Sequence, residues 1–98
     1  MTKTIRYHDH LMASLKDPAE AAAYLNAVAA DGDVRFMLKA LRNVVEARGG
    51  VGALAKRAHM NRPSLYRALS NSGNPEVRTL VAILKFCGLK FMPAVAHG

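Results

Sequence analysis

The sequence predicts one all-α domain of five helices, followed by a short C-terminal β-strand. Apolar residues recur at helical spacing in five segments, and capping residues, prolines and glycines mark where those segments begin and end. Only the tail after Gly88 shows the two-residue alternation of a strand. Because the chain has 98 residues and 51% of them are hydrophobic, it suffices for one domain with a modest core. We divide it into an N-terminal segment, residues 1–16, and a domain, residues 17–98.

The first helix is expected to run from Asp17 to about Ala30. Asp17 can cap it, Pro18 suits its first turn, and Glu20 stands three residues after Asp17, as in a capping box. The residues that this helix is expected to turn toward the core are Tyr24, Leu25 and Val28.

The second helix is expected to follow the cap residue Asp33 and to end near Arg48. It is amphipathic, so one side should be buried. That side is predicted to comprise Phe36, Met37, Leu41, Val44 and Val45. The pair Gly49-Gly50 then breaks the helix at a point where a left-handed backbone is needed.

The segment from Val51 to Ser70 predicts two short helices joined by a sharp turn. Each helix has an apolar face at helical spacing, made of Leu54, Ala55 and Ala58 on the first and of Leu65, Ala68 and Leu69 on the second. Asn61 is a good N-cap for the second helix and Pro63 fits its first turn, so this helix should begin near Arg62. The layout is that of a DNA-reading helix-turn-helix.

Polar side chains of the second helix are predicted to point away from its apolar stripe. These are Arg62, Ser64, Tyr66 and Arg67. An arginine can pair bidentately with guanine in the major groove, and a serine can contact base edges or phosphates. Lys56 and Arg57 on the preceding helix are predicted to hold adjacent phosphates.

The net charge of +7 is concentrated in the half of the chain that contains this motif. Residues 49–98 hold seven basic residues and one acid, Glu76, whereas residues 1–48 hold seven basic and six acidic ones. A basic half that coincides with a helix-turn-helix is the electrostatic pattern expected of a phosphate-binding face.

The last helix is expected to open at Pro75 or Glu76 and to stop at Gly88. Its inward residues are predicted to be Val77, Leu80, Ile83, Leu84 and Cys87.

The short strand is predicted to begin at Leu89 and to include Phe91. A single strand needs a partner, which can be residues Thr4 to Tyr7, the same strand of a second subunit, or another protein's sheet edge. We favour an intermolecular partner. In the N-terminal segment, helical spacing suggests an additional short helix through Tyr7, Leu11, Met12 and Leu15.

The run from Asp17 to Phe91 resembles the HigA-like group of Xre-family helix-turn-helix antitoxins, also described as addiction module antidote or prophage DNA-binding proteins. The resemblance lies in DPAEAAAYLNAV, in DVRFMLKALRNVVEARGGVGALAKRA and in NRPSLYRALSNSGNPEVRTLVAILKFCGLKF. Its most specific part is the ordered series ARGG, LAKRA, NRPSLYRALS, GNP and GLKF. It implies an Xre/lambda-repressor-like five-helix domain with a strand, a homodimer, a palindromic operator in the module's own promoter, and a RelE/ParE-like toxin.

The resemblance also implies roles for individual residues. Arg62, Ser64 and Arg67 fall where recognition-helix side chains meet bases, while Asn61 and the start of the preceding helix fall near phosphates. Many members carry a phosphate-gripping Gln where this chain has Val51. The backbone N–H groups of Gly52 and Ala53 can take over that contact. His59 stands at a turn position that glycine commonly fills.

Enzymatic and metal-dependent functions are not expected from these residues. Cys87 is predicted to be buried, and no third group would orient a pair formed with His59. The cluster His8-Asp9-His10 lacks further ligands and is expected to be a solvated turn. We therefore expect no catalysis, no metal and no cofactor. With no run of about 20 apolar residues, the chain is expected to be cytoplasmic.

Two other functions fit the same residues. One is a protein-interaction module that neutralises a toxin without significant DNA binding, and the other is a phage-type repressor with no toxin partner. A DNA reader differs from the interaction module in that its affinity falls steeply as salt rises.

Overall fold

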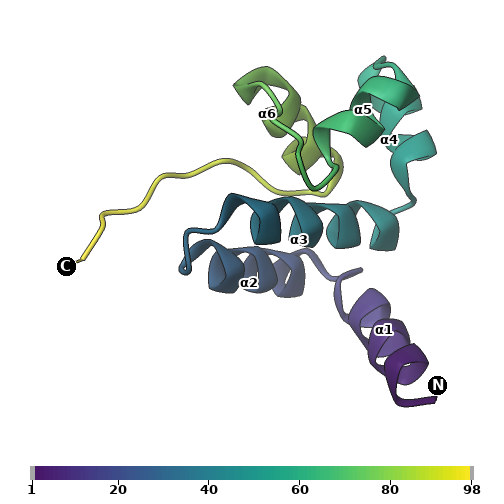
Figure 1. Ribbon diagram of the computed structural model, residues 1–98, viewed down its shortest axis with the longest axis vertical. Coiled ribbons are helices and arrows are strands. Elements are labelled where there is room, and N and C mark those ends of the chain that lie inside the picture. Colours follow the sequence, from purple (N-terminus) through teal and green to yellow (C-terminus); the bar gives the residue numbers. More distant parts are fainter. Residues whose placement is uncertain (1, 98) are drawn as a thin grey trace.

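The computed structural model describes residues 2–97, which form six α-helices and contain no β-strand (Figure 1). The helices are α1 (Thr2–Ser14), α2 (Pro18–Ala29), α3 (Val34–Ala47), α4 (Val51–Ala58), α5 (Arg62–Ala68) and α6 (Val77–Phe86). α3 crosses the middle of the molecule, with α2 on one side and α4, α5 and α6 on the other, while α1 projects from one end (Figure 1).

The predicted fold of five helices and a C-terminal β-strand is wrong. The chain is all-α, but α1 adds a helix before the five expected ones, and the residues expected to form a strand do not. α1 forms because the helical spacing in the N-terminal segment gives it one apolar side. Leu15, just after its end, is buried, and Leu11 and Met12 pack against the core.

The tail after α6, residues 89–97, is extended but unpaired within the described chain. A strand needs a neighbouring backbone to supply hydrogen bonds. The intrachain partner considered above, Thr4 to Tyr7, lies inside α1, where the helix uses those backbone groups itself. The tail is held at its root, where the Leu89 N–H donates to the Leu84 carbonyl at 2.8 Å.

The predicted N-caps are confirmed for three helices. The side chains of Asp17, Asp33 and Asn61 accept hydrogen bonds from the backbone N–H groups of Ala19, Arg35 and Ser64, at 3.0, 2.9 and 3.0 Å. Each satisfies one of the four N–H groups that the start of a helix leaves free. The break after α3 is also confirmed, because Gly49 and Gly50 both have positive φ, 128° and 93°.

α3 supplies the centre of the core, but one predicted core residue lies on its surface. Val44 and Val45 are fully buried, and Leu41 is buried as expected. Phe36 is wrongly predicted: its side chain is 59% exposed, and Leu38 is buried instead. Phe36 and Leu38 point in directions about 200° apart around the helix axis, so they lie at opposite limits of the apolar side, and the packing of neighbouring helices selects the one that is covered.

α6 closes the core from the other side. Ile83 and Cys87 are fully buried, whereas Leu80 and Leu84 are only partly covered. The prediction that Val77 points inward is wrong, because its side chain is 72% exposed. Val77 is the first residue of α6, and its side chain stays largely uncovered at this end of the helix.

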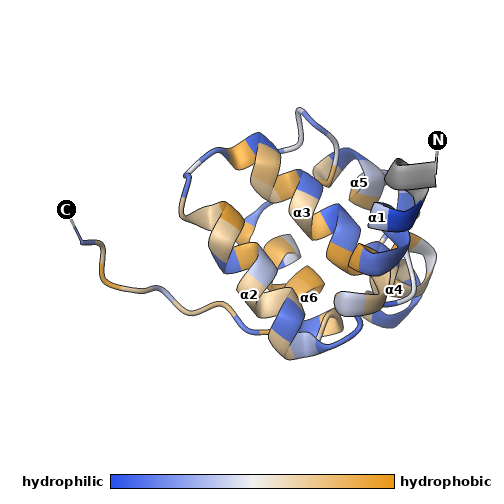
Figure 2. Ribbon diagram, turned by 90° about the horizontal axis from the view of Figure 1, so that it is seen from below, coloured by the Kyte–Doolittle hydropathy of each residue, from blue (hydrophilic) through white to orange (hydrophobic). Residues whose placement is uncertain are grey.

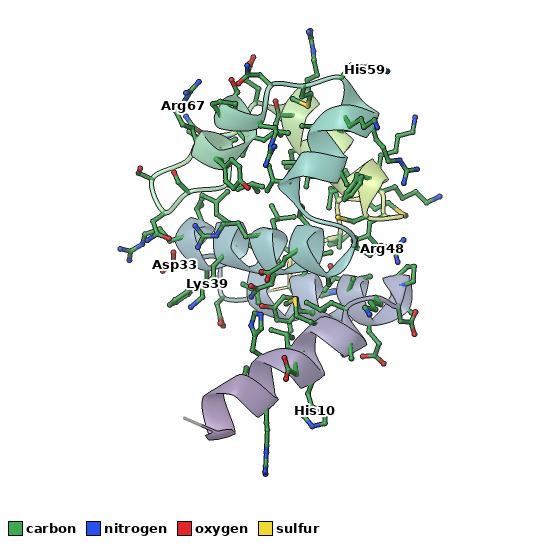
Figure 3. The ribbon with its side chains drawn as sticks, turned by 90° about the vertical axis from the view of Figure 1, so that its right-hand side faces the viewer. His10, Asp33, Lys39, Arg48, His59 and Arg67 are labelled. Atoms are coloured by element: carbon green, nitrogen blue, oxygen red, sulfur yellow. The ribbon has the colours of Figure 1, made fainter. Side chains whose placement is uncertain are left out.

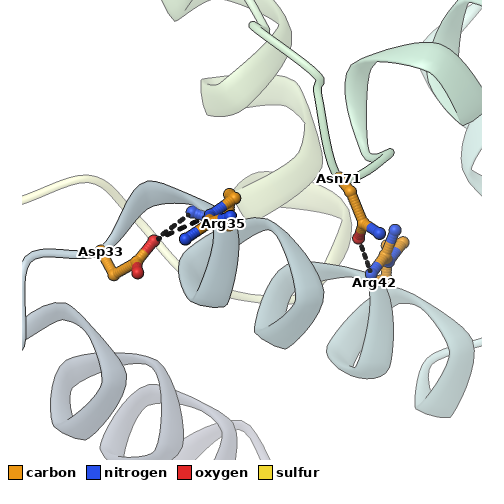
Figure 4. Close-up of polar contacts among 4 residues, drawn as sticks. All are labelled: Asp33, Arg35, Arg42 and Asn71. Atoms are coloured by element: carbon orange, nitrogen blue, oxygen red, sulfur yellow. Dashed lines mark hydrogen bonds and ion pairs between the residues drawn. The ribbon is translucent and has the colours of Figure 1, made fainter.

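Two arginines of the α3 region connect it to distant segments. Arg42 donates from Nη2 to Oδ1 of Asn71 at 3.1 Å, which ties α3 to the loop after α5 (Figure 4). Arg48, the residue that caps α3, donates from Nη1 to the Lys16 carbonyl in the turn between α1 and α2. Both bonds engage a charged donor, which makes them stronger than neutral ones.

Gly73 provides a test of how tightly the loop after α5 is packed. A Cβ at this position would lie 2.7 Å from the carbonyl carbon of Ala68, at the end of α5. Because backbone must then move, Gly73→Ala should lower the free energy of unfolding by about 1–3 kcal/mol. The exposed neighbour Ser72 provides the control, since Ser72→Ala should stay within about 0.5 kcal/mol of the parent. Urea unfolding measures both, and equal stability of the two variants would contradict this packing.

The buried thiol of Cys87 should make the free energy of unfolding depend on pH in the alkaline range. Burial raises the pKa of its thiol from 9.0 to about 11, against the opposing effect of the Arg48 guanidinium. From pH 9 to 11 the unfolded thiol loses its proton before the folded one, so the free energy of unfolding should fall as pH rises. The slope from this group is at most about 1.4 kcal/mol per pH unit. Urea unfolding across this range should show a shallower decline for Cys87→Ala, and parallel profiles would rule the effect out.

Candidate nucleic-acid interface

The turn between α4 and α5 sets how the two helices cross. α4 ends at Ala58, and His59 then adopts a left-handed conformation with φ 55° and ψ 45°. The Met60 N–H donates to the Ala55 carbonyl at 2.9 Å, which closes the end of α4. Among the described residues His59 is the one non-glycine with positive φ, at the position that the family resemblance identified as a usual glycine.

α5 is anchored by one side and exposed on the other. Leu65 and Leu69 are buried as predicted, while Ala68 is only partly covered. The four residues predicted to point outward are all exposed: Arg62, Ser64, Tyr66 and Arg67. This end of the molecule carries both Arg67 and His59, and it lies opposite the end formed by α1 and His10 (Figure 3).

Ser64 links the cap of α5 to its outer face. Its backbone N–H donates to the side chain of Asn61, and its hydroxyl Oγ accepts from Nη2 of Arg67 at 3.2 Å. Asn61 therefore shapes the start of the helix, and Ser64 orients the guanidinium one turn further on. That guanidinium keeps further N–H donors free for an external acceptor.

Arg62 does not extend freely into solvent but lies against the start of α4. Its guanidinium carbon is 3.6 Å from the position that a Cβ on Gly52 would occupy. The N-cap of α4 is Gly50, which has no side chain to bond the first N–H groups of the helix. Arg62 thus brings a positive charge beside uncapped N–H groups, and both favour an anion.

The two basic residues of α4 lie in different surroundings. Lys56 is exposed and follows Gly52 by four residues, so it shares the helix face that Arg62 covers. The Arg57 guanidinium instead stacks over the Phe86 ring of α6, 5.6 Å from its centroid. Ala53 is partly covered, and its Cβ lies 3.4 Å from the position that a Cβ on Gly49 would occupy.

The loop from α5 to α6 contributes to the site in a way that sequence reasoning missed. A hollow of about 550 Å³ lies between α5 and this loop. Its wall combines Ser64 and Arg67 with polar loop residues that include Ser72 and Asn74. The segment SNSGNP signals a turn by composition. Nothing local in it indicates that the turn folds back beside the outer face of α5.

The electrostatics of α4 and α5 are one-sided, and the acid beside them is Glu76, which lines the hollow next to Arg67. From Val51 to Ser70 the chain has four basic residues and no acid. The two ion pairs found among residues 2–97, His8 with Glu46 and Arg35 with Asp33, both lie outside α4 and α5. The four basic residues of α4 and α5 therefore take part in no ion pair among the described residues.

The N-terminal cluster His8-Asp9-His10 lies in α1 rather than in a turn. His8 Nε2 is 3.6 Å from Glu46 Oε1, and the described residues contain no group of three His, Cys, Asp or Glu side chains arranged to hold a metal. The helices of the described chain are also too short or too polar for any of them to span a bilayer.

Sequence comparisons extend the likeness beyond the helix-turn-helix. A family described as "Probable addiction module antidote protein" matches residues 6–95, which include most of α1 and nearly all of the tail. The chain is 31% identical over 91 residues to an uncharacterized protein of Haemophilus influenzae, and the alignment covers 93% of this chain and 92% of that relative. No solved structure matches the chain.

The left-handed residue in the turn yields a stability test. A β-branched side chain is poorly tolerated at the φ of His59, so His59→Val should lower the free energy of unfolding by about 1–2 kcal/mol. His59→Gly removes the same imidazole without a steric penalty and should stay within about 1 kcal/mol of the parent. Urea unfolding of both variants measures this difference. If the two variants prove equally stable, backbone strain at residue 59 does not influence the free energy of unfolding.

Proposed function

The chain belongs to the family of probable addiction module antidote proteins, and from this premise we propose that it is a type II antitoxin that represses its own promoter. An antidote protein implies a toxin as its partner. We propose that this toxin has a RelE/ParE-like fold and that the chain itself belongs to the HigA-like Xre group. It acts in the cytoplasm, as a homodimer on double-stranded operator DNA, and uses neither catalysis nor a cofactor.

The observation that carries the proposal is the acid-free outer face of α5. Arg62, Ser64 and Arg67 are exposed there on a helix whose opposite side is anchored in the core. A helix that is fixed on one side and cationic on the other suits insertion into the major groove. The concentration of net charge in residues 49–98 supports the same function, because phosphate neutralisation provides most of the affinity for DNA.

Base reading is assigned to Arg67, with Ser64 and Tyr66 beside it. The Ser64 hydroxyl already holds one nitrogen of the Arg67 guanidinium at 3.2 Å, which limits the orientations that this side chain samples. Pre-orientation lowers the entropy that binding must overcome. The remaining donors of the guanidinium can pair with O6 and N7 of a guanine.

Phosphate binding is assigned to the start of α4 and its surroundings. The donors assigned to a backbone phosphate are the N–H groups of Gly52 and Ala53, which no side chain caps, together with Lys56 and the Arg62 guanidinium that lies near Gly52. Asn61 contributes by holding the first turn of α5 in place. Arg57 is assigned a weaker contact, because its guanidinium stacks on Phe86.

A dimer would place two copies of α5 in successive major grooves, about 34 Å apart along the operator. Each half-site would then be read by the same residues, and occupancy of the promoter would block transcription. This two-fold arrangement corresponds to the palindromic operator that the family resemblance implies.

Titration of the protein against its own upstream DNA tests the proposal. Arg67→Ala should weaken binding to this fragment by roughly 5- to 150-fold, equivalent to about 1–3 kcal/mol, and change binding to an unrelated fragment little. Lys56→Ala should weaken both fragments alike and reduce the slope of log affinity against log salt by about 1. Fluorescence anisotropy at several salt concentrations measures both effects.

The matched control is Arg6→Ala, which removes the same charge from an exposed position of α1. That helix lies at the other end of the molecule (Figure 3). It should leave selective binding intact. If Arg67→Ala binds the upstream fragment as tightly as the parent does, the reading role of α5 is wrong. If the parent binds both fragments equally and weakly, the interaction module without significant DNA binding replaces the repressor.

A further inference from the structure

An apolar groove lies away from the candidate nucleic-acid interface, between α2, α3 and α6. Its volume is about 520 Å³, and none of the residues assigned to DNA lines it. The walls include Leu25 of α2, Met37 and Leu41 of α3, and Leu80 and Leu84 of α6, and the root of the tail closes one end. The groove is therefore an opening in the hydrophobic core rather than a polar surface site.

The apolar surface continues beyond the groove along two helices. On α3, Val34 precedes Met37 and Leu41 at helical spacing, and its side chain is exposed. On α6, Val77 and Val81 lie on the same side as Leu84 and are also exposed. A contiguous apolar area of this kind on a small soluble domain marks an interaction surface.

The tail leaves the same region without covering it. Residues Leu89 to Met92 line the groove, and the chain beyond them runs away from the domain as a largely hydrophobic segment (Figures 1 and 2). Met92 is 72% exposed and Val95 is 82% exposed. The six residues from 92 to 97 can span about 20 Å when extended, enough to cross a neighbouring domain's groove.

We propose that a second copy of this chain occupies the groove and that the two copies exchange their tails across it. The proposal rests on the homodimer proposed above and identifies its interface. Groove and tail root are contiguous, so a two-fold axis beside them would direct each tail toward the partner's groove. Each copy would then cover Met92 and Val95 of the other, together with the exposed valines of α6.

The scarcity of charge at this surface favours an apolar occupant, and the tail of a second copy is one. Lys90 is the one charged residue that lines the groove, and no carboxylate lies among the lining residues. The free tail is equally poor in charge, because residues 91–96 contain no ionisable side chain. Groove and tail therefore match each other in chemistry, as a self-complementary interface requires.

Sedimentation of the full-length protein over a range of concentrations tests the interface. The parent should be a dimer, and Val77→Asp and Met92→Asp should each raise the dissociation constant about tenfold or more, because a carboxylate would be buried in an apolar contact. Tyr7→Asp is the matched control, since it places the same charge on an exposed aromatic residue of α1. It should leave the dissociation constant unchanged.

Exchange of tails is tested in a mixed sample by nuclear magnetic resonance. One copy carries Ala96→Cys with a spin label and contains no isotope label, and the other copy is isotope-labelled and has no spin label. The spin label on the first copy should broaden the amide signals of Ala29 and Leu84 in the second. The native thiol of Cys87 is buried and should not take the label. No broadening in the mixed dimer would overturn the exchange.

The outcomes separate this inference from the proposed function. A dimer that tolerates Val77→Asp and Met92→Asp overturns the interface and leaves the repressor proposal standing. A protein that stays monomeric but binds its upstream fragment selectively overturns both the interface and the proposed homodimer, and leaves DNA reading by α5 standing. A dimer that depends on Val77 and Met92 but binds DNA without selectivity supports the interface and overturns the repressor. A monomer whose Val77→Asp variant loses a co-purified toxin assigns the groove to that toxin and refutes the exchange.

Discussion

The burial of α3 is the constraint on which the rest of the molecule depends. This helix contacts α1, α2 and α4, and its residues Val44 and Val45 are shielded completely from solvent. Because protein interiors are packed as densely as organic crystals, neighbours on opposite sides of α3 cannot shift independently. The Gly49-Gly50 turn follows directly, so the position of α3 also determines where α4 starts and how it is directed.

α5, the candidate DNA-recognition helix, depends most on the rest of the fold for its stability. α5 has seven residues, well below the length at which an isolated helix is stable in water. It persists because Leu65 is fully buried, Asn61 caps its start, and the left-handed turn at His59 directs it against α4. Its exposed residues therefore carry little of the packing, which leaves their chemistry available for recognition.

The cationic and the uncovered apolar surfaces of the chain lie on different elements. The cationic surface is built by α4 and α5, with the polar loop after α5 beside it, whereas the uncovered apolar surface is built by α2, α3, α6 and the tail. α6 borders both, since Thr79 lines the hollow beside Arg67 while Leu80 and Leu84 line the apolar groove. A protein that has to bind DNA and a protein partner at the same time needs such a separation, because overlapping sites would compete.

The sequence by itself determined the features that depend on neighbouring residues. Asp17, Asp33 and Asn61 cap their helices, and the outward residues of α5 are exposed as predicted, because capping and helical periodicity act within a few residues. Tertiary structure decided what depends on distant partners. It left Phe36 and Val77 uncovered and placed Arg62 against Gly52 and Arg57 over Phe86. Within residues 2–97 it also provides no strand with which the tail could pair. Which edge of an apolar stripe is buried, and whether an extended segment becomes a strand, is set by the element that packs beside it.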